Sequence, residues 1–160
     1  MALRGDRLII ETDITNTLSD VAAPGVVLCY SVAGSGLAIG DTCGASQLAA
    51  SPSGLKVHGI LLNNFVSIDQ TRYHKNFQKD EMVVGDKATV LRKGWVITNK
   101  VTGTPTGKGD KAYLTTNGQV TPTVSSTGGV VATPLVGEFQ GLVDENGYVK
   151  LEVNLPGPTV

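Results

Sequence analysis

Two nearly identical four-residue segments, Gly85-Asp86-Lys87-Ala88 and Gly109-Asp110-Lys111-Ala112, lie in the second half of the chain. Each precedes a short run in which apolar and polar residues alternate, and each run is bounded by a turn that contains glycine. Alternation with a period of two is typical of a β-strand with one buried face. The repeat therefore restricts this half of the chain to strands joined by tight turns.

The clearest hairpin is predicted around Asn117-Gly118. Residues 111–116 before this pair and residues 119–121 after it have the composition of strands. Asn-Gly favours a two-residue primed turn, because both of its central residues need a positive φ. We therefore expect two antiparallel strands that meet at this turn.

A second hairpin is predicted at the C-terminal end, where residues 139–143 lead into the turn at residues 144–147. The strand after this turn alternates strictly, and its apolar face consists of Val149, Leu151, Val153 and Leu155. This pattern predicts a strand with one buried and one exposed face. A third hairpin is predicted to bend at Lys93-Gly94, between residues 88–91 and 95–98.

The composition favours strands along the whole chain. The 160 residues include 20 Val, 17 Thr and 20 Gly. β-Branched residues favour strands, and glycine favours tight turns. A chain of this length has the size of one domain and buries about two thirds of its unfolded surface. We expect an all-β fold, either a small β-barrel or a β-sandwich built from hairpins.

The first half of the chain is less regular. Residues 1–20 show neither helical periodicity nor clean alternation, and they predict an extended N-terminal arm. Residues 21–155 then form a single β domain, in which the continuous apolar run at residues 26–32 predicts a strand covered on both faces. Residues 156–160, which contain two prolines, are predicted to be a C-terminal tail.

Three further elements are predicted between the arm and the repeat. Residues 46–50 are expected to form a short helical turn, and residues 55–68 a long strand. Residues 69–82 contain the longest polar stretch without Gly or Pro, and they predict a projecting polar loop.

Charge and hydropathy exclude two classes of partner. The net charge is −1, so no long-range field attracts nucleic acid or an anionic membrane. No apolar stretch approaches the roughly 20 residues of a membrane-spanning helix. The first residues also lack the apolar core of a secretory signal, which favours folding in a reducing cytoplasm. In that setting Cys29 and Cys43 are expected to be small buried apolar groups, although a disulfide between them stays an alternative.

The sequence contains no recognisable catalytic or cofactor motif. The segment 103–109 superficially resembles a phosphate-binding loop, but its glycine spacing is one residue short and no helix is predicted after it. His58, His74, Cys29 and Cys43 do not form the close ligand pairs that are typical of zinc sites. No serine or cysteine occurs with a histidine in a recognised nucleophile motif. We expect no metal, no cofactor and no enzymatic activity.

The second half of the chain resembles the capsid cement, or decoration, proteins of tailed bacteriophages. The resemblance lies in the run from Gly109-Asp110 through Asn117-Gly118 to Thr121, in Pro134-Leu135-Val136-Gly137 and in the final alternating strand. Residues 83–155 match best. Residues 1–82 match less well, because of the long apolar strand and the polar stretch that follows it.

The resemblance implies a structural virion protein without catalytic activity. Such a protein is made in the host bacterial cytoplasm, binds the outer surface of an expanded phage head and clamps neighbouring major capsid subunits. It acts as a homotrimer or a homodimer. The resemblance also implies a small barrel fold.

Two groups of residues are expected to bind partners. The arm contributes Leu8, Ile9 and Ile10, and the projecting loop contributes Arg72, Tyr73, Lys75 and Phe77. An alternative function is a β-sandwich carbohydrate- or receptor-binding module of a virion spike or fibre. In that case Trp95, Tyr73 and Tyr113 are the aromatic rings on which sugars would stack.

Overall fold

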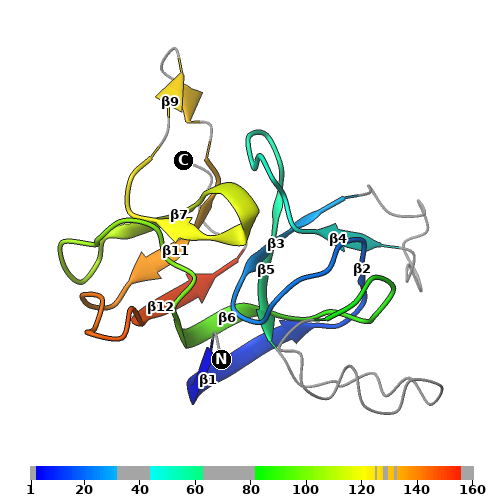
Figure 1. Ribbon diagram of the computed structural model, residues 1–160, viewed down its shortest axis with the longest axis horizontal. Helices are drawn as coiled ribbons and strands as arrows, with labels where there is room; N and C mark the ends of the chain where they lie inside the picture. The colour runs from blue at the N-terminus through cyan, green and yellow to red at the C-terminus, as the bar shows by residue number, and fades with distance from the viewer. Residues whose placement is uncertain are drawn as a thin grey trace.

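The computed structural model describes residues 3–31, 44–62, 82–124, 126–127, 130–131 and 133–155. These residues form an all-β fold, as the sequence predicted, with one ten-stranded sheet and a separate two-stranded ribbon (Figure 1). The strands of the sheet are ordered β2-β4-β3-β5-β6-β12-β11-β7-β8, and β1 pairs with β6. All described pairs are antiparallel except β2 with β4.

The strands are short except for β1 and β6. Their bounds are β1 Leu3–Asp13, β2 Thr17–Leu18, β3 Val27–Tyr30, β4 Ala45–Gln47, β5 Val57–Leu62, β6 Thr89–Thr98, β7 Lys111–Leu114, β8 Val120–Thr121, β9 Ser126–Thr127, β10 Val130–Val131, β11 Leu135–Phe139 and β12 Val149–Asn154. A single 3-10 turn, η1 (Thr116–Gly118), lies between β7 and β8.

Strand β6 connects the two halves of the sheet. Leu91 pairs with Thr12 of β1 and with Ile60 of β5, so these two strands lie on opposite sides of β6. Further along, Val96 pairs with Arg7 of β1 on one side and with β12 on the other. Strands β5 and β12 therefore follow one another along the same edge of β6, while β1 covers the opposite edge.

The predicted hairpin bend at Lys93-Gly94 is wrong, because β6 runs continuously through both residues. Gly94 has a φ of 136°, and a Cβ atom at this position would collide with the carbonyl oxygen of Leu8 in β1. Only glycine allows β1 to lie this close. The local sequence around Gly94 resembles a turn, but glycine is needed at this position because β1 lies against it.

Two apolar clusters lie on the two faces of the sheet. In β3 and β5 the side chains of Val27 and Ile60 face one cluster, while those of Leu28 and Leu61 face the other. The prediction of a strand covered on both faces is thus confirmed for β3. The larger cluster also contains Phe139 and other residues from the second half, so the two halves share one core.

The hairpin predicted around Asn117-Gly118 is confirmed. The predicted C-terminal hairpin is present, but its first strand is β11 at residues 135–139 and not residues 139–143. Asn117 and Gly118 have φ values of 56° and 70°, as a primed turn requires, and β7 pairs with β8 across them. Strand β12 pairs with β11, and Val149, Leu151 and Val153 are buried as the alternation predicted. The turn between β11 and β12 is closed by Asp144, whose Oδ1 accepts hydrogen bonds from the backbone N–H groups of residues 146 and 148 at 2.9 and 2.7 Å.

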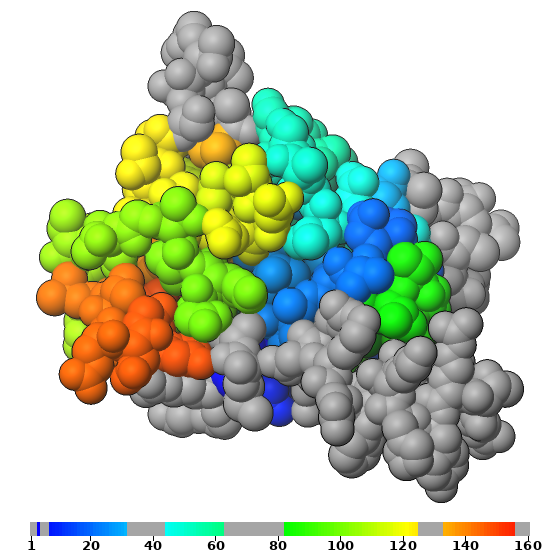
Figure 2. Space-filling view, viewed as in Figure 1, coloured from blue at the N-terminus to red at the C-terminus, as the bar shows by residue number. Residues whose placement is uncertain are grey.

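The β7–β8 turn packs against the first half of the chain. The backbone N–H of Asn117 donates to the carbonyl oxygen of Ala49 at 3.0 Å. In Figure 2 the yellow surface of this part of the chain adjoins the cyan surface of the first half. Strands β2 and β8 lie at the two ends of the sheet and do not pair with each other in the described residues. The sheet thus folds over a shared core, but no hydrogen-bonded pairing of β2 with β8 closes it.

Other predictions for the first half have mixed outcomes. The helical turn predicted at residues 46–50 is wrong, because β4 occupies residues 45–47 and pairs with β2 and β3. The strand predicted at residues 55–68 is confirmed as β5 from Val57 to Leu62, while residues 55 and 56 precede the strand. Residues 63–81, which include most of the predicted loop, and the predicted tail at 156–160 lie outside the described residues, and the division into arm, domain and tail stays a prediction.

Cys29 is free and fully buried in β3, as a small apolar group is expected to be. Burial raises the pKa of its thiol to about 11, so the thiol is protonated near neutral pH. Cys43, the partner in the alternative of a disulfide, lies outside the described residues.

Candidate functional site

Strand β1 exposes three consecutive large apolar side chains. Leu8 is 46% exposed, Ile9 42% and Ile10 68%. The register of β1 against β6 shifts between Ile9 and Glu11, so the regular alternation of inward and outward side chains is interrupted here. The predicted arm is thus extended, and it forms a strand of the chain's own sheet with an apolar strip on its surface.

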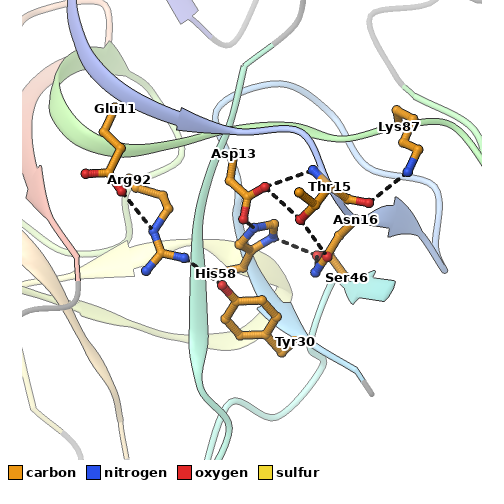
Figure 3. A network of polar contacts seen from close by, with 9 residues as sticks. All are labelled: Glu11, Asp13, Thr15, Asn16, Tyr30, Ser46, His58, Lys87 and Arg92. Atoms are coloured by element: carbon orange, nitrogen blue, oxygen red, sulfur yellow. Dashed lines mark hydrogen bonds and ion pairs between the residues drawn. The ribbon is translucent and has the colours of Figure 1, made fainter. Parts of the chain in front are cut away.

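A buried polar network fastens the end of β1 to the rest of the sheet (Figure 3). The Nε2 atom of His58, in β5, lies 3.1 Å from Oδ2 of Asp13. The Nδ1 atom of His58 lies 2.7 Å from Oγ of Ser46, in β4. Because the carboxylate can only accept, Nε2 carries the proton and Nδ1 accepts the hydrogen bond from the Ser46 hydroxyl.

Each polar atom at the centre of this network has a partner. The Oγ of Ser46 accepts a hydrogen bond from Nδ2 of Asn16 at 3.2 Å. The other carboxylate oxygen of Asp13 accepts from both the backbone N–H and the hydroxyl of Thr15, at 2.8 and 2.7 Å. The ring of Tyr30 lies 4.5 Å from the His58 ring, centroid to centroid, and covers it. Buried polar groups stabilise a fold only when they are satisfied in this way.

The pKa of both titratable groups is lowered. For His58 the main cause is burial, which disfavours the imidazolium, and the positive charge of Arg92 acts in the same direction. Hydrogen bonding and attraction to Asp13 oppose this shift without reversing it. For Asp13 burial acts to raise the pKa, but the hydrogen bonds from Thr15 and the contact with His58 outweigh it. The network therefore holds a neutral imidazole against a carboxylate.

Charged side chains extend the network along β1. The Nη1 atom of Arg92 donates to the hydroxyl of Tyr30 at 2.7 Å. The Nε atom of Arg92 lies 3.8 Å from Oε1 of Glu11, too far for a hydrogen bond but close enough for charge attraction. Lys93 approaches the other oxygen of Glu11 at 3.3 Å. The contacts of Glu11 join β1 to β6 near the C-terminal end of β1, and the contact of Arg92 with Tyr30 joins β6 to β3.

The hydrogen bonds run from Ser46 to His58 to Asp13, in the same order as in the catalytic triads of hydrolases. The burial of Ser46 and His58, however, excludes nucleophilic catalysis by this serine. Ser46 and His58 are both 0% exposed. A nucleophile needs room for a substrate carbonyl within about 3 Å and donors for the developing oxyanion. Neither hydroxyl nor imidazole reaches the surface here, so the network serves to hold strands together.

Comparison with known protein families identifies the chain. A family model described as "Structural cement protein (E217 gp24/Pam3 gp6)" matches residues 7–154. The chain belongs to this family of phage structural cement proteins. A search of curated proteins gives no significant match.

Membership of the cement family gives the protein a structural role in a phage capsid. It confirms the resemblance carried by the second half of the chain and extends it to the first half. The match begins at Arg7, so it includes β1 from that residue onward, its apolar strip and the residues of the buried network. A strand that the sequence treated as a separate arm is therefore part of the family's common region.

The structure describes only one of the two groups of predicted partner-binding residues. Leu8, Ile9 and Ile10 lie together on β1 and are exposed. The second group, Arg72, Tyr73, Lys75 and Phe77, lies outside the described residues. Binding by either group stays a prediction.

The buried network was not predicted from the sequence. His58 was expected in a strand, but Asp13 precedes it by 45 residues and Ser46 by 12. Neither spacing belongs to a recognised motif. The one available signal was a histidine within the otherwise apolar stretch 57–62, because a histidine buried in a strand needs a hydrogen-bond partner.

The loop at residues 103–109 uses its backbone donors internally. Asp110 Oδ2 accepts hydrogen bonds from the backbone N–H groups of Thr106 and Gly107 at 2.6 and 3.1 Å. These are the donors that a phosphate-binding loop would offer to its ligand. No group of three or more His, Cys, Asp or Glu side chains in the described ranges is arranged to hold a metal ion.

The aromatic rings proposed for sugar stacking do not form an open platform in the described part of the chain. The Nζ atom of Lys150 lies 3.6 Å from the centroid of the Trp95 ring and covers one of its faces. Tyr113 lies on β7 and is only partly exposed, while Tyr73 lies outside the described residues. No helix in the described segments is long and apolar enough to span a membrane.

Proposed function

We propose that this protein binds the outer surface of an expanded phage head and clamps neighbouring major capsid subunits. In this proposal it acts as a homotrimer or a homodimer, is made in the host bacterial cytoplasm and performs no catalysis. The observation that supports it most directly is the family match, which spans residues 7–154. The other support is physical and comes from the sheet and its surface.

A clamp needs a body that transmits load without deforming. Strand β6 pairs along its length with β1 on one edge and with β5 and β12 on the other, which joins the two halves of the sheet. The core below it contains residues of both halves. A core shared by both halves and strands paired on both edges of β6 resist deformation, as a structural role requires.

The proposed contact surfaces are the apolar strip of β1 and the polar segment after β5. The strip, Leu8 to Ile10, is the part assigned to neighbouring copies. The segment that carries Arg72, Tyr73, Lys75 and Phe77 is assigned to the shell on the basis of its sequence. Its mixture of basic and aromatic side chains is typical of protein interfaces.

Cosedimentation tests the proposal. The purified protein is incubated with expanded and with unexpanded shells that lack it, and separately with a glycan array. We expect binding to expanded shells and a higher temperature of shell disruption. The double variant Tyr73→Ala, Phe77→Ala should lose shell binding, whereas Leu142→Ala, at a site 63% exposed, should keep it.

Two outcomes would contradict the proposal. The first is an absence of binding to either form of shell by a protein whose circular dichroism shows an intact β fold. The second is binding to glycans without affinity for shells, which would support the alternative of a spike module.

A further inference from the structure

The buried network closes on itself as a ring of polar contacts (Figure 3). Two of its contacts involve His58, which faces Asp13 at 3.1 Å and Ser46 at 2.7 Å. Two more involve Asn16, which faces Ser46 and the hydroxyl of Thr15, both at 3.2 Å. The fifth contact joins the Thr15 hydroxyl to Asp13 at 2.7 Å. The ring is complete because Asp13 uses one carboxylate oxygen for His58 and the other for Thr15.

The ring has one hydrogen fewer than it has contacts. With a neutral imidazole, His58 donates to Asp13, and the Ser46 hydroxyl donates to His58. Asn16 donates to Ser46 through Nδ2. The hydroxyl of Thr15 then has a single hydrogen for two acceptors, Oδ1 of Asp13 and Oδ1 of Asn16. Its contact with Asp13 is the shorter one, so the contact between Thr15 and Asn16 lacks a hydrogen.

One added proton supplies the missing hydrogen. An imidazolium donates from both nitrogens, so Ser46 must accept from His58 and turn its own hydrogen towards Asn16. A half-turn of the Asn16 amide about its last side-chain bond exchanges Oδ1 with Nδ2. The amide oxygen then accepts from Ser46, and the amide nitrogen donates to the Thr15 hydroxyl, which still donates to Asp13. Every contact of the ring now has one hydrogen and all point the same way round, an arrangement in which hydrogen bonds strengthen one another.

The surroundings of the ring suit such an exchange. A Cβ atom at Gly44 would collide with Oδ1 and Cγ of Asn16, so the amide can lie in the ring only because residue 44 is glycine. Asn16, Ser46 and His58 are buried. Thr15 is exposed and the side chain of Asp13 is 21% exposed, so the ring meets solvent on the side where the hydrogen is missing. A proton can enter there without unfolding of the core.

Charged groups around the ring determine when the proton enters. The charged and titratable side chains nearest to His58 are Asp13 and Glu11 of β1, Tyr30 of β3, Arg92 of β6, and Lys87, which precedes β6. Asp13 attracts the proton. Arg92 repels it, although Glu11 offsets part of this charge, and Lys87 adds a positive charge beside the backbone carbonyl of Thr15 at 2.8 Å. Burial and Arg92 lower the pKa of His58, so the imidazole is neutral near pH 7 and is protonated in acid.

From this geometry we propose that the ring is a proton-binding switch with two hydrogen-bond directions. Uptake of one proton from solvent by Nδ1 of His58 reverses the Ser46 hydroxyl and the Asn16 amide, and release of the proton restores them. The step forms one N–H bond, breaks no bond within the protein and neutralises the single negative charge of the ring. The segment between β1 and β2 thus changes its hydrogen bonds with pH while β1 stays paired with β6. The inference concerns the folded chain alone and does not depend on shell binding.

An NMR titration observes the switch directly. The substitution His74→Gln leaves His58 as the only histidine of the chain. The nitrogen shifts of its imidazole should show a hydrogen on Nε2 alone near pH 8 and on both nitrogens in acid. The Nδ2 hydrogens of Asn16 should give a nuclear Overhauser effect to Ser46 in the first state and to the Thr15 methyl group in the second. Circular dichroism at each pH checks that the chain is folded.

The variant Thr15→Val distinguishes the ring from a simple pair of His58 and Asp13. In the ring it removes the contact that the proton completes, so the pH midpoint of the His58 titration should fall by about half a pH unit, the equivalent of one hydrogen bond. In a simple pair the midpoint should rise instead, because Asp13 loses a donor and attracts the imidazolium more strongly. Thr15→Ser keeps the hydroxyl and should titrate as the wild type does. Thr12→Val, at an exposed threonine outside the ring, is the matched control and should leave the midpoint unchanged.

Three outcomes overturn the inference. They are an Asn16 amide that stays beside Ser46 through its nitrogen at both ends of the titration, a midpoint that does not fall in Thr15→Val, and a chain that unfolds before His58 takes up its proton. In the last case the ring binds no proton in the folded state. All these measurements are made without shells. Failure of the switch would thus leave the role as a cement intact, and failure of shell binding would leave the switch intact.

Discussion

His58 and Asp13 are joined by a hydrogen bond of 3.1 Å across 45 residues of sequence. The contact connects the C-terminal end of β1 with the first residues of β5, next to the point where both strands pair with β6. The imidazole is 0% exposed and the Asp13 side chain 21%, so this carboxylate lies between the Nε2–H and solvent and is its acceptor. This acceptor therefore contributes to holding β1 in the sheet, in addition to the pairing of β1 with β6.

The first prediction concerns this acceptor. Asp13→Ala removes the acceptor of the Nε2–H of His58, which costs about 1–3 kcal/mol of unfolding free energy. Urea denaturation measures the loss. The control is Glu145→Ala, an exposed carboxylate in the turn before β12, which should change stability by less than about 0.5 kcal/mol. Equal effects of the two substitutions would show that the contact does not stabilise the fold.

The second prediction concerns pH. The pKa of His58 is lower in the folded protein than the value of 6.5 in the unfolded chain. At pH values between these two pKa values, the unfolded state therefore binds more protons than the folded state. The free energy of unfolding is therefore highest above pH 6.5 and decreases as the pH falls through this window. The lowered pKa of Asp13 adds a second loss of unfolding free energy, which is confined to pH values below 3.8.

Urea denaturation from pH 8 to pH 5 measures the first of these losses. His58→Gln should flatten the dependence on pH, since the titrating group is gone. His74→Gln is the control, because it removes the other histidine of the chain and should keep the slope. If His74→Gln flattened the curve and His58→Gln did not, the assignment to the buried network would be wrong.

The third prediction concerns the close approach of β1 to β6. Gly94→Ala adds a Cβ atom that collides with the Leu8 carbonyl oxygen, at a φ of 136° that side chains rarely adopt. We expect a loss of at least about 2 kcal/mol in unfolding free energy and faster hydrogen exchange of the β1 amides. Gly141→Ala, where the new atom meets open space, should change stability by less than about 1 kcal/mol. Normal exchange of the β1 amides in Gly94→Ala would contradict the contact.

The elements that the sequence predicted correctly are those determined by nearby residues. Asn117-Gly118 specifies its turn because both residues tolerate positive φ, and this preference holds wherever the turn lies. The alternation from Val149 to Val153 identifies the buried face of β12, because a strand at the surface of a core has one apolar face. The family resemblance rested on the same local features.

The elements that the sequence did not predict depend on contacts between distant segments. Gly94 has the local character of a turn residue, but its conformation is required by Leu8, which lies 86 positions earlier in the chain. Ser46 has the propensity of a loop or helical turn and is held in a strand by β2 and β3. The hydrogen bonds of His58 likewise join three strands that no local pattern brings together.

The fourth prediction separates two costs of replacing a glycine in a turn. Gly118 and Gly147 have similar φ values of 70° and 79°, so alanine is strained at both. At Gly147 the added Cβ atom meets open space. At Gly118 it would lie 2.6 Å from Leu48 Cδ1 and 2.7 Å from the carbonyl oxygen of Val27, where the β7–β8 turn packs on the first half. The difference in unfolding free energy between the two variants therefore measures how tightly the two halves of the sheet pack at this turn.

We expect Gly147→Ala to lower the unfolding free energy by about 1 kcal/mol, because only the backbone conformation is strained. Gly118→Ala should cost about 1–3 kcal/mol more, since Val27 and Leu48 must move to admit the new atom. Thermal unfolding followed by circular dichroism compares the two variants at the same protein concentration. Equal losses would mean that the turn does not press against Val27. A larger loss at Gly118 would show that the Asn-Gly turn, besides reversing the chain, holds the two halves of the cement protein together.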